Sequence, residues 1–282
     1  MRYGLYFPNF GIFGDPATVV DIAATAEGAG WDGVFPWDHI QIGHWAGPVI
    51  DPWVALTAAA TATERIHLGP MVTPLPRRRP TKVARETATL DHLSGGRLIL
   101  GVGIGWPPDV DFGNFGDAAD NRIRGEQLDE GLELLEALWS GEVIDHRGTH
   151  YTAHNARFLP RPLQQPRIPI WVGGMWPRKP AFRRAARFDG VFPIAVGDTL
   201  DDGAAMTPEM LADVVACVGA HRDGGEPFEV AVGGSSFPGA KNAPPADFAA
   251  AGATWWMESI GWPPDIPLAD WMEFIAAGPP AE

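Results

Sequence analysis

The chain has 282 residues, 45% of them hydrophobic, and a formal net charge of −14 at pH 7. This charge argues against nucleic acid and anionic membranes as partners, and the sequence has no run of about 18 apolar residues that could span a bilayer. Residues 1–10 lack the pattern of a secretory signal, and a single cysteine, Cys217, excludes an internal disulfide. We therefore expect a cytoplasmic protein, one domain over residues 1–282, and Cys217 as an inert core residue.

Strand and helix patterns alternate along the chain. Short apolar runs bounded by glycine, proline or aspartate indicate strands, and apolar positions three and four residues apart indicate helices. The expected strands cover residues 2–7, 33–37, 66–73, 97–102, 168–172, 190–194, 228–232 and 253–258. The expected helices cover residues 16–28, 51–63, 81–94, 128–139, 177–188, 208–222, 246–251 and 268–276, with a short hairpin at residues 142–151.

This alternation gives eight βα units, the number in a (β/α)8 TIM barrel. The alternative is an open, doubly wound sheet, which usually needs fewer strands per domain. We expect the barrel, with the ligand site on the loops that follow the strands, because ligands bind at that face of the fold.

A glycine-rich segment follows the expected fourth strand. Gly101, Gly103 and Gly105 stand where the strand should emerge from the sheet, and alternate glycines there let a flat ligand approach the backbone. The segment does not fit the dinucleotide fingerprint G-x-G-x-x-G, because Trp106 or Pro108 occupies the position of the third glycine. A Rossmann-type NAD site is therefore disfavoured.

Basic residues gather after two expected strands, although the whole chain is acidic. Residues 77–79 are three arginines after the third strand, and the fifth strand is followed by Arg178, Lys179, Arg183, Arg184 and Arg187. Basic side chains near the mouth of a barrel would suit a small anionic ligand. Alternatively, several of them are solvated residues of helix faces.

Six sequence blocks occur in an order typical of one family: GWDGVFPWDHI, LGPMVTPLPRRRP, LDHLSGGRLILGVGIGW, EQLDEGLELLEALWSG, IPIWVGG and GATWWMESI. From Met1 to about Ile260 the chain resembles the luciferase-like monooxygenase superfamily. The resemblance implies a TIM barrel that binds flavin mononucleotide (FMN) or the deazaflavin coenzyme F420. The short chain is similar to the compact members, many of which are F420-dependent oxidoreductases.

The resemblance also implies a cofactor site. Gly173 and Gly174, followed by a helix starting near Pro177, would bind the cofactor phosphate. In the third strand, a bulge with a cis Met71–Val72 peptide would support the cofactor ring; Pro70 leaves a cis Gly69–Pro70 bond as the alternative. The implied cofactor-binding set is Met71, Val72, Gly101, Gly103, Gly105, Gly173 and Gly174.

The implied catalytic pair is Asp38 and His39, at the end of the second strand, where an imidazole can bind the cofactor or transfer a proton. Some sugar-phosphate-oxidising members carry an acidic glutamate where this chain has Trp106, so we expect an apolar pocket instead. Its expected lining is Asn9, Trp37, Trp106 and Trp176, with Trp262 also at the rim. The segment Gly-Trp-Pro-Pro-Asp occurs at residues 105–109 and 261–265, either as two lips of the mouth or by chance.

The predicted function is hydride transfer between F420 and a small, apolar organic substrate. The alternative is an FMN-dependent monooxygenase that uses O2 and a partner reductase, and the resemblance suggests a homodimer. More remote alternatives are a non-catalytic cofactor-binding barrel and a glycosidase that uses Asp38 and Glu258. We expect no metal site, because His39 and His44 lack the spacing of metal ligands.

Overall fold

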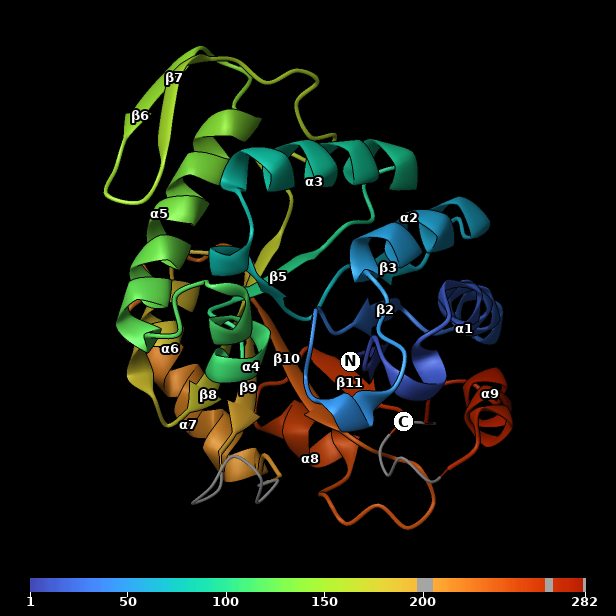
Figure 1. The fold of residues 1–282 in the computed structure, drawn as a ribbon. Helices are drawn as coiled ribbons and strands as arrows, with labels where there is room; N and C mark the ends of the chain where they lie inside the picture. The colour runs from blue at the N-terminus through green and yellow to red at the C-terminus, as the bar shows by residue number, and fades with distance from the viewer. Residues whose placement is uncertain (197–204, 262–265, 281–282) are drawn as a thin grey trace.

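A ring of parallel strands surrounded by helices forms the fold (Figure 1). The computed structural model describes residues 1–196, 205–261 and 266–280. The strands of the ring are β1 (Arg2–Phe7), β2 (Gly33–Pro36), β3 (His67–Leu68), β4 (Thr73–Pro74), β5 (Leu100–Gly103), β8 (Ile170–Trp176), β9 (Gly190–Ala195), β10 (Glu229–Gly234) and β11 (Trp255–Ser259).

The strands pair in the order β3-β2-β1-β11-β10-β9-β8-β5-β4. Its two end segments, β3 and β4, are parts of one barrel strand interrupted at residues 69–72. A parallel bridge between Leu68 and Leu98 joins β3 to the segment that leads into β5 and so closes the ring. The nine segments therefore make eight barrel strands, and the predicted TIM barrel is confirmed against the open sheet.

The helices lie outside the strands, and their ends follow local sequence signals. Asp15, Asp51 and Asp120 cap the first backbone N–H groups of α1, α2 and α5, and Gly95 ends α3 in a left-handed conformation. The helices are α1 (Pro16–Ala29), α2 (Pro52–Ala62), α3 (Pro80–Ser94), α4 (Pro108–Asp111), α5 (Asn121–Trp139), α6 (Lys179–Ala185), α7 (Pro208–Gly219), α8 (Pro245–Ala250) and α9 (Leu268–Ala276), and β6 (Ile144–Arg147) and β7 (Thr152–Ala156) form the predicted hairpin.

Alternate strand residues fill two separate cores, as expected for a barrel. Inside the ring, the indole of Trp171 lies 5.3 Å from that of Trp255, and Phe35 packs against both rings. The next residue along β11, Trp256, points outward and packs on Phe248 of α8. The barrel interior is therefore a packed aromatic core, and a ligand has room only above it, at the carboxyl ends of the strands.

Two expectations about the periphery can be compared with the structure. Cys217 on α7 packs against the hydrophobic core but is only partly buried, so the predicted core position is confirmed in part. Among the described residues, no helix combines the length and hydropathy needed to cross a bilayer.

Candidate active site at the mouth of the barrel

The interruption of the third barrel strand is a bulge at residues 69–72. Its Met71–Val72 peptide is cis, as predicted, and the Gly69–Pro70 bond is not. The bulge is tied to the second strand by two backbone hydrogen bonds, in which the N–H groups of Gly69 and Met71 donate to the carbonyls of Val34 (3.3 Å) and Pro36 (2.9 Å).

Two glycines of β5 make room for this bulge, and Gly105 after the strand makes room for Phe112. A Cβ atom added to Gly101 would lie 2.3 Å from the carbonyl oxygen of Pro70, and one on Gly103 would lie 2.8 Å from the Val72 side chain. Gly105 has φ +81°, and its Cβ would lie 2.5 Å from Phe112. On the Cβ side of these glycines the space is therefore filled by the chain's own atoms, and the approach of a flat ligand to their backbone stays a prediction.

Val72 is the bulge residue that faces the mouth. Met71 is buried in the core inside the ring, whereas Val72 stays partly exposed and packs against that core beside Tyr6. The two Val72 methyl groups fill the positions that Cβ atoms on Gly103 and Gly173 would take. Val72, with Tyr6 and Phe192 in edge contact at 5.1 Å, forms a floor above the packed core.

Gly173 and Gly174 lie within β8 and not in the turn after it, contrary to the prediction. A Cβ on Gly174 would lie 2.4 Å from that of Ala181, so this glycine allows α6 to pack closely on the strand. The turn that follows contains the cis Trp176–Pro177 peptide. The space that a side chain at Gly174 would take is therefore filled by a helix, and phosphate binding by the backbone of these glycines stays a prediction.

Asp38 is an anchor for the residues around it, which corrects its predicted catalytic role. Its side chain is fully buried and accepts hydrogen bonds from Thr73 Oγ1 (2.9 Å), Arg77 Nη2 (2.8 Å) and Arg78 Nη2 (2.9 Å). Burial by itself would raise the pKa of Asp38, but the two arginines outweigh it and hold the pKa below its usual value. The carboxylate thus ties the end of the bulge to the arginines behind the mouth.

Hydrogen bonds fix the ring and the backbone of His39 and leave one edge of the ring free. Its Nδ1 lies 3.2 Å from Oδ2 of Asp111, a fully buried carboxylate that also accepts from Ile40 N–H (2.9 Å) and from Arg77. Its backbone is fixed by Asn9, which donates to the His39 carbonyl and accepts from the His39 N–H. Asn9 is itself completely buried, so it positions His39 and does not line a pocket as predicted.

Aromatic side chains surround the free edge of His39. Trp37 lies 5.9 Å from the His39 ring and 5.4 Å from Tyr6, and Phe10 joins Trp37 to the exposed Trp45. The Trp37 Nε1 atom is buried and has no hydrogen-bond partner in the described structure. This cluster brings together His39 of the predicted catalytic pair and Trp37 of the predicted pocket, and it leaves one donor available to a ligand.

The other predicted tryptophans are placed differently. Trp106 is half-buried after β5, with no ring contact among the described residues. Trp176 points away from the barrel interior, packs against Phe182 of α6 at 5.2 Å, and belongs to the core under the helices. Trp262 and most of the second Gly-Trp-Pro-Pro-Asp segment lie outside the described residues.

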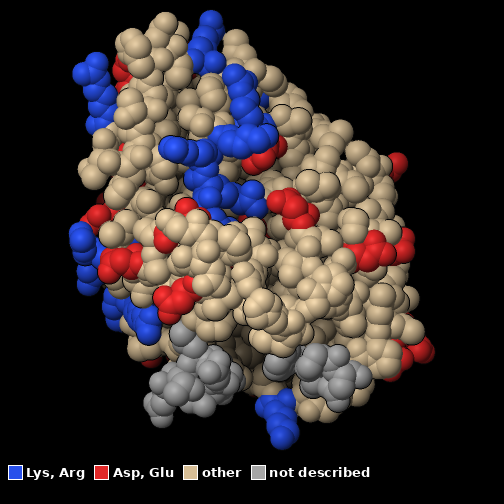
Figure 2. All heavy atoms as spheres, in the orientation of Figure 1, with Lys and Arg blue, Asp and Glu red and all other residues tan. Residues whose placement is uncertain are grey.

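Half of the gathered basic residues form ion pairs among the described residues. Lysine and arginine side chains gather over α3 and the turn before it (Figure 2), but Arg77 and Arg78 bind Asp38 there. After β8, Arg184 binds Asp129 at 2.6 Å and Arg187 lies 3.6 Å from Glu133. The arginines after the third strand therefore organise the site and leave the mouth without their charge.

The glycosidase alternative fails because both carboxylates that it would need are buried and hydrogen-bonded within the protein. Glu258 points into the helix layer, where it accepts from Trp256 Nε1 (2.8 Å) and from the N–H and hydroxyl of Ser236 (both 2.7 Å). Burial raises the pKa of Glu258. Since Asp38 is also fully buried, neither predicted carboxylate is free to flank a glycosidic bond.

Two site residues were missed by sequence reasoning. Asp111 lies in the short helix α4 after β5, and Arg124 of α5 is fully buried and donates to the carbonyls of Ile104 and Gly105 at 2.9 Å. Asp111 could have been found from the sequence, because it is an acidic residue beside Phe112 that comes just after the glycine-rich strand. Nothing in the helical pattern distinguished Arg124 from a solvated arginine.

Comparison with known proteins identifies relatives of this architecture. Residues 3–254 match the family described as luciferase-like monooxygenase. The chain is 34% identical over 225 residues to the F420-dependent glucose-6-phosphate dehydrogenase of Beutenbergia cavernae, an alignment that covers 71% of this chain and 62% of that protein. The chain thus spans less than two thirds of that relative's length.

Two solved structures share the fold. An F420-dependent secondary alcohol dehydrogenase in complex with an F420-acetone adduct has a TM-score of 0.75 at 18% identity, covering 92% of each chain. The oxygenating constituent of 3,6-diketocamphane monooxygenase from Pseudomonas putida, in complex with FMN, has a TM-score of 0.68 at 22% identity, covering 83% of this chain and 67% of that chain. With a family match over most of its length and a closed (β/α)8 barrel, the chain belongs to the luciferase-like monooxygenase family.

Proposed function

We propose that the protein is an oxidoreductase that transfers hydride between coenzyme F420 and a small, uncharged, apolar organic substrate at the mouth of the barrel. The observation that carries the proposal is the position of Val72, which the glycines of β5 and β8 accommodate on the inner core. Tyr6 packs against the same core and contacts Trp37 at 5.4 Å. The Beutenbergia relative, which is named for F420, supports the choice of cofactor.

The residues at the mouth fit a planar cofactor. Trp37 Nε1 is a buried donor without a partner, and Val72 presents a partly exposed apolar surface next to Tyr6. On β10, a Cβ added to Gly233 would be in ordinary van der Waals contact with Phe192 (3.7 Å) and Ser259 (3.8 Å), so a methyl group fits there without a clash. We assign Val72 and Trp37 to holding the cofactor, whose contribution when bound is two-electron hydride chemistry.

The protein's own residues position the reactants. Asp111 accepts from Nδ1–H of His39, which leaves Nε2 as the nitrogen that faces a ligand and accepts or returns a proton. Asn9 fixes the backbone of His39. Since His39 has a side chain only 15% exposed, its ring has little freedom to turn away from the mouth.

The substrate class follows from charge and apolar surface. Arg77 and Arg78 are neutralised by two buried aspartates, and Arg124 is bound to loop carbonyls, so none of the three is available for a phosphate. Exposed apolar side chains lie on the loops and strand ends of this face: Ile12, Ile40, Trp45, Phe115 and Ile194. We therefore expect a neutral alcohol or carbonyl compound in place of the sugar phosphate for which the relatives are named.

The proposal is tested by cofactor binding and turnover. Tryptophan fluorescence of the purified protein is titrated with F420 and, separately, with FMN, and turnover is followed by the visible absorbance of the oxidised deazaflavin with neutral alcohols and with glucose 6-phosphate. We expect F420 binding and activity with the neutral substrates. FMN binding without F420 binding would favour the alternative, an FMN-dependent monooxygenase supplied by a partner reductase.

A matched pair of variants locates the site. Gly233→Leu adds a bulky side chain beside Phe192 at the mouth and should weaken cofactor binding by at least about tenfold, whereas Gly28→Leu places the same side chain on α1, where nothing lies within 4 Å. Equal cofactor affinity of the two variants would show that the cofactor does not bind at the mouth.

We further propose a homodimer, which light scattering of the purified protein would confirm or contradict.

A further inference from the structure

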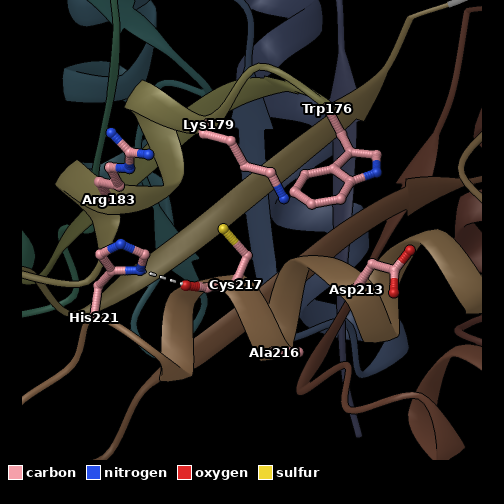
Figure 3. A pocket seen from close by; sticks show the side chains of 7 residues that line it. All are labelled: Trp176, Lys179, Arg183, Asp213, Ala216, Cys217 and His221. Atoms are coloured by element: carbon pink, nitrogen blue, oxygen red, sulfur yellow. Dashed lines mark hydrogen bonds between the residues drawn. The ribbon is translucent and has the colours of Figure 1, made fainter.

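A groove between α6 and α7 lies on the helix side of the barrel wall, apart from the mouth (Figure 3). Its volume is about 470 Å³, within the range of small-molecule sites. It is lined by Trp176, Lys179 and Arg183 on one side and by Asp213, Ala216, Cys217 and His221 on the other. The mechanism proposed above uses none of these residues.

Two cations of the groove differ from their neighbours on the same helix. Arg184 and Arg187 are paired with Asp129 and Glu133, but Lys179 and Arg183 form no ion pair within the described chain. Lys179 instead lies with its Nζ 4.0 Å from the centre of the Trp176 ring. Two unpaired cations face one groove in a protein whose net charge is −14.

The rest of the lining is largely apolar. Trp176, Ala216 and the Cys217 thiol contribute apolar surface to the lining, and the thiol lies near its centre in the view of Figure 3. His221 donates its Nδ1–H to the Cys217 carbonyl at 2.9 Å, which fixes its ring at the end of the groove near Arg183. An apolar body with one negative group would therefore match both parts of the lining.

We infer that this groove binds a small aromatic carboxylate, with the carboxylate on Lys179 and Arg183 and the ring against Ala216 and Cys217, next to the Lys179–Trp176 pair. The charge of the lining supports an anion, because Lys179 and Arg183 outnumber the single carboxylate of Asp213. The inference is independent of cofactor binding, since the mouth residues lie on the other side of the barrel wall. The thiol takes no part in binding and serves only as a reporter.

Cys217 is the only cysteine of the chain, so its alkylation reports on the groove directly by mass spectrometry. The first measurement compares anionic iodoacetate with neutral iodoacetamide, because the ratio of the two rates isolates the charge of the reagent. We expect this ratio to exceed that of free cysteine and to fall about threefold or more in the double variant Lys179→Gln, Arg183→Gln. The control is Arg187→Gln, which removes a paired arginine outside the groove lining and should leave the ratio unchanged.

The second measurement uses naphthalene-2-carboxylate as the probe ligand and its neutral carboxamide as the comparison. The carboxylate should slow alkylation of Cys217 by iodoacetamide in a saturable way, and the carboxamide should need a concentration about tenfold higher. The double variant should lose this protection, while circular dichroism and the melting temperature show that it is folded. An absence of protection by the carboxylate, equal protection by the carboxamide, or an unchanged rate ratio in the double variant would overturn the inference.

Discussion

Replacing Asp111 by asparagine tests the central arrangement of the site most directly. The fully buried carboxylate accepts from Ile40 N–H and Gln41 N–H through one oxygen and from His39 and Arg77 through the other. Asparagine can keep the first oxygen, but its NH2 group would face two donors. Removing one partner of a buried ion pair costs about 3–5 kcal/mol; we expect about 3 kcal/mol, because Arg77 retains Asp38.

The effect on His39 separates positioning from stability. With asparagine at position 111, the amide can donate to His39 Nδ1, which would move the imidazole proton to Nε2 and remove the acceptor that faces the mouth. We expect turnover to fall by about 100-fold, the lower end of the range for general acid–base catalysis. Cofactor affinity should change little, because Val72 and Trp37 are untouched. Steady-state kinetics, fluorescence titration and 15N chemical shifts of the His39 ring measure the three quantities.

Asp38→Asn is the matched control. It removes the other buried carboxylate bound to Arg77, so it should lower the free energy of unfolding, measured in urea, by a similar amount. Unlike Asp111, Asp38 forms its hydrogen bonds with the arginines and not with the His39 ring. The ring should therefore keep its proton on Nδ1 in this variant. The reasoning would be refuted if Asp111→Asn retained turnover within about twofold of wild type, or if both variants shifted the His39 proton equally.

Three further predictions concern stability. The pKa of Asp38 is lowered in the folded protein, so ionised Asp38 stabilises the fold above about pH 4, and this stabilisation is lost as the pH falls through the folded pKa. In Asp38→Asn, the free energy of unfolding measured in urea should therefore depend less on pH in the acidic range. Glu258 has a raised pKa, so stability should decline as the pH rises from about 4 through its folded value, and Glu258→Gln should remove that decline. Gly174→Ala should lower the free energy of unfolding by about 1–3 kcal/mol through its clash with Ala181, whereas Gly28→Ala should raise it by up to about 1 kcal/mol; equal effects in urea melts would contradict the packing explanation.

The sequence predicted the barrel well because each strand and helix carries its own local signal. The first strand and the last helix have the expected bounds, Arg2–Phe7 and Leu268–Ala276. The third strand was expected to be continuous over residues 66–73 but is divided into β3 and β4. Hydrophobic periodicity does not register such an interruption, since the bulge residues are as apolar as a strand; only the family resemblance indicated it.

The site was harder to predict, because its key contacts join residues far apart in the chain. Asp38 and His39 were identified together, yet their roles differ: one faces Arg77 and Arg78, and the other faces Asp111. Adjacent residues at a strand end point to opposite sides, so proximity in sequence gave no information on which of them reaches the mouth. The glycines were identified as a site feature, and nothing in the sequence indicated that Gly101, Gly103 and Gly173 also make room for the bulge.

A continuous network of hydrogen bonds and ion pairs connects the floor of the mouth to His39. Thr73, next to Val72, donates to Asp38; Asp38 and Asp111 both bind Arg77; and Asp111 accepts from His39. The two aspartates and the arginines at positions 77 and 78 are buried or nearly so and sum to zero charge. A buried network of this kind fixes geometry at little net gain in stability, because desolvation of the charges offsets their attraction. Its consequence is positional: the surface proposed to support the cofactor and the imidazole proposed to move a proton are held by the same four side chains, so neither can shift without disturbing the other.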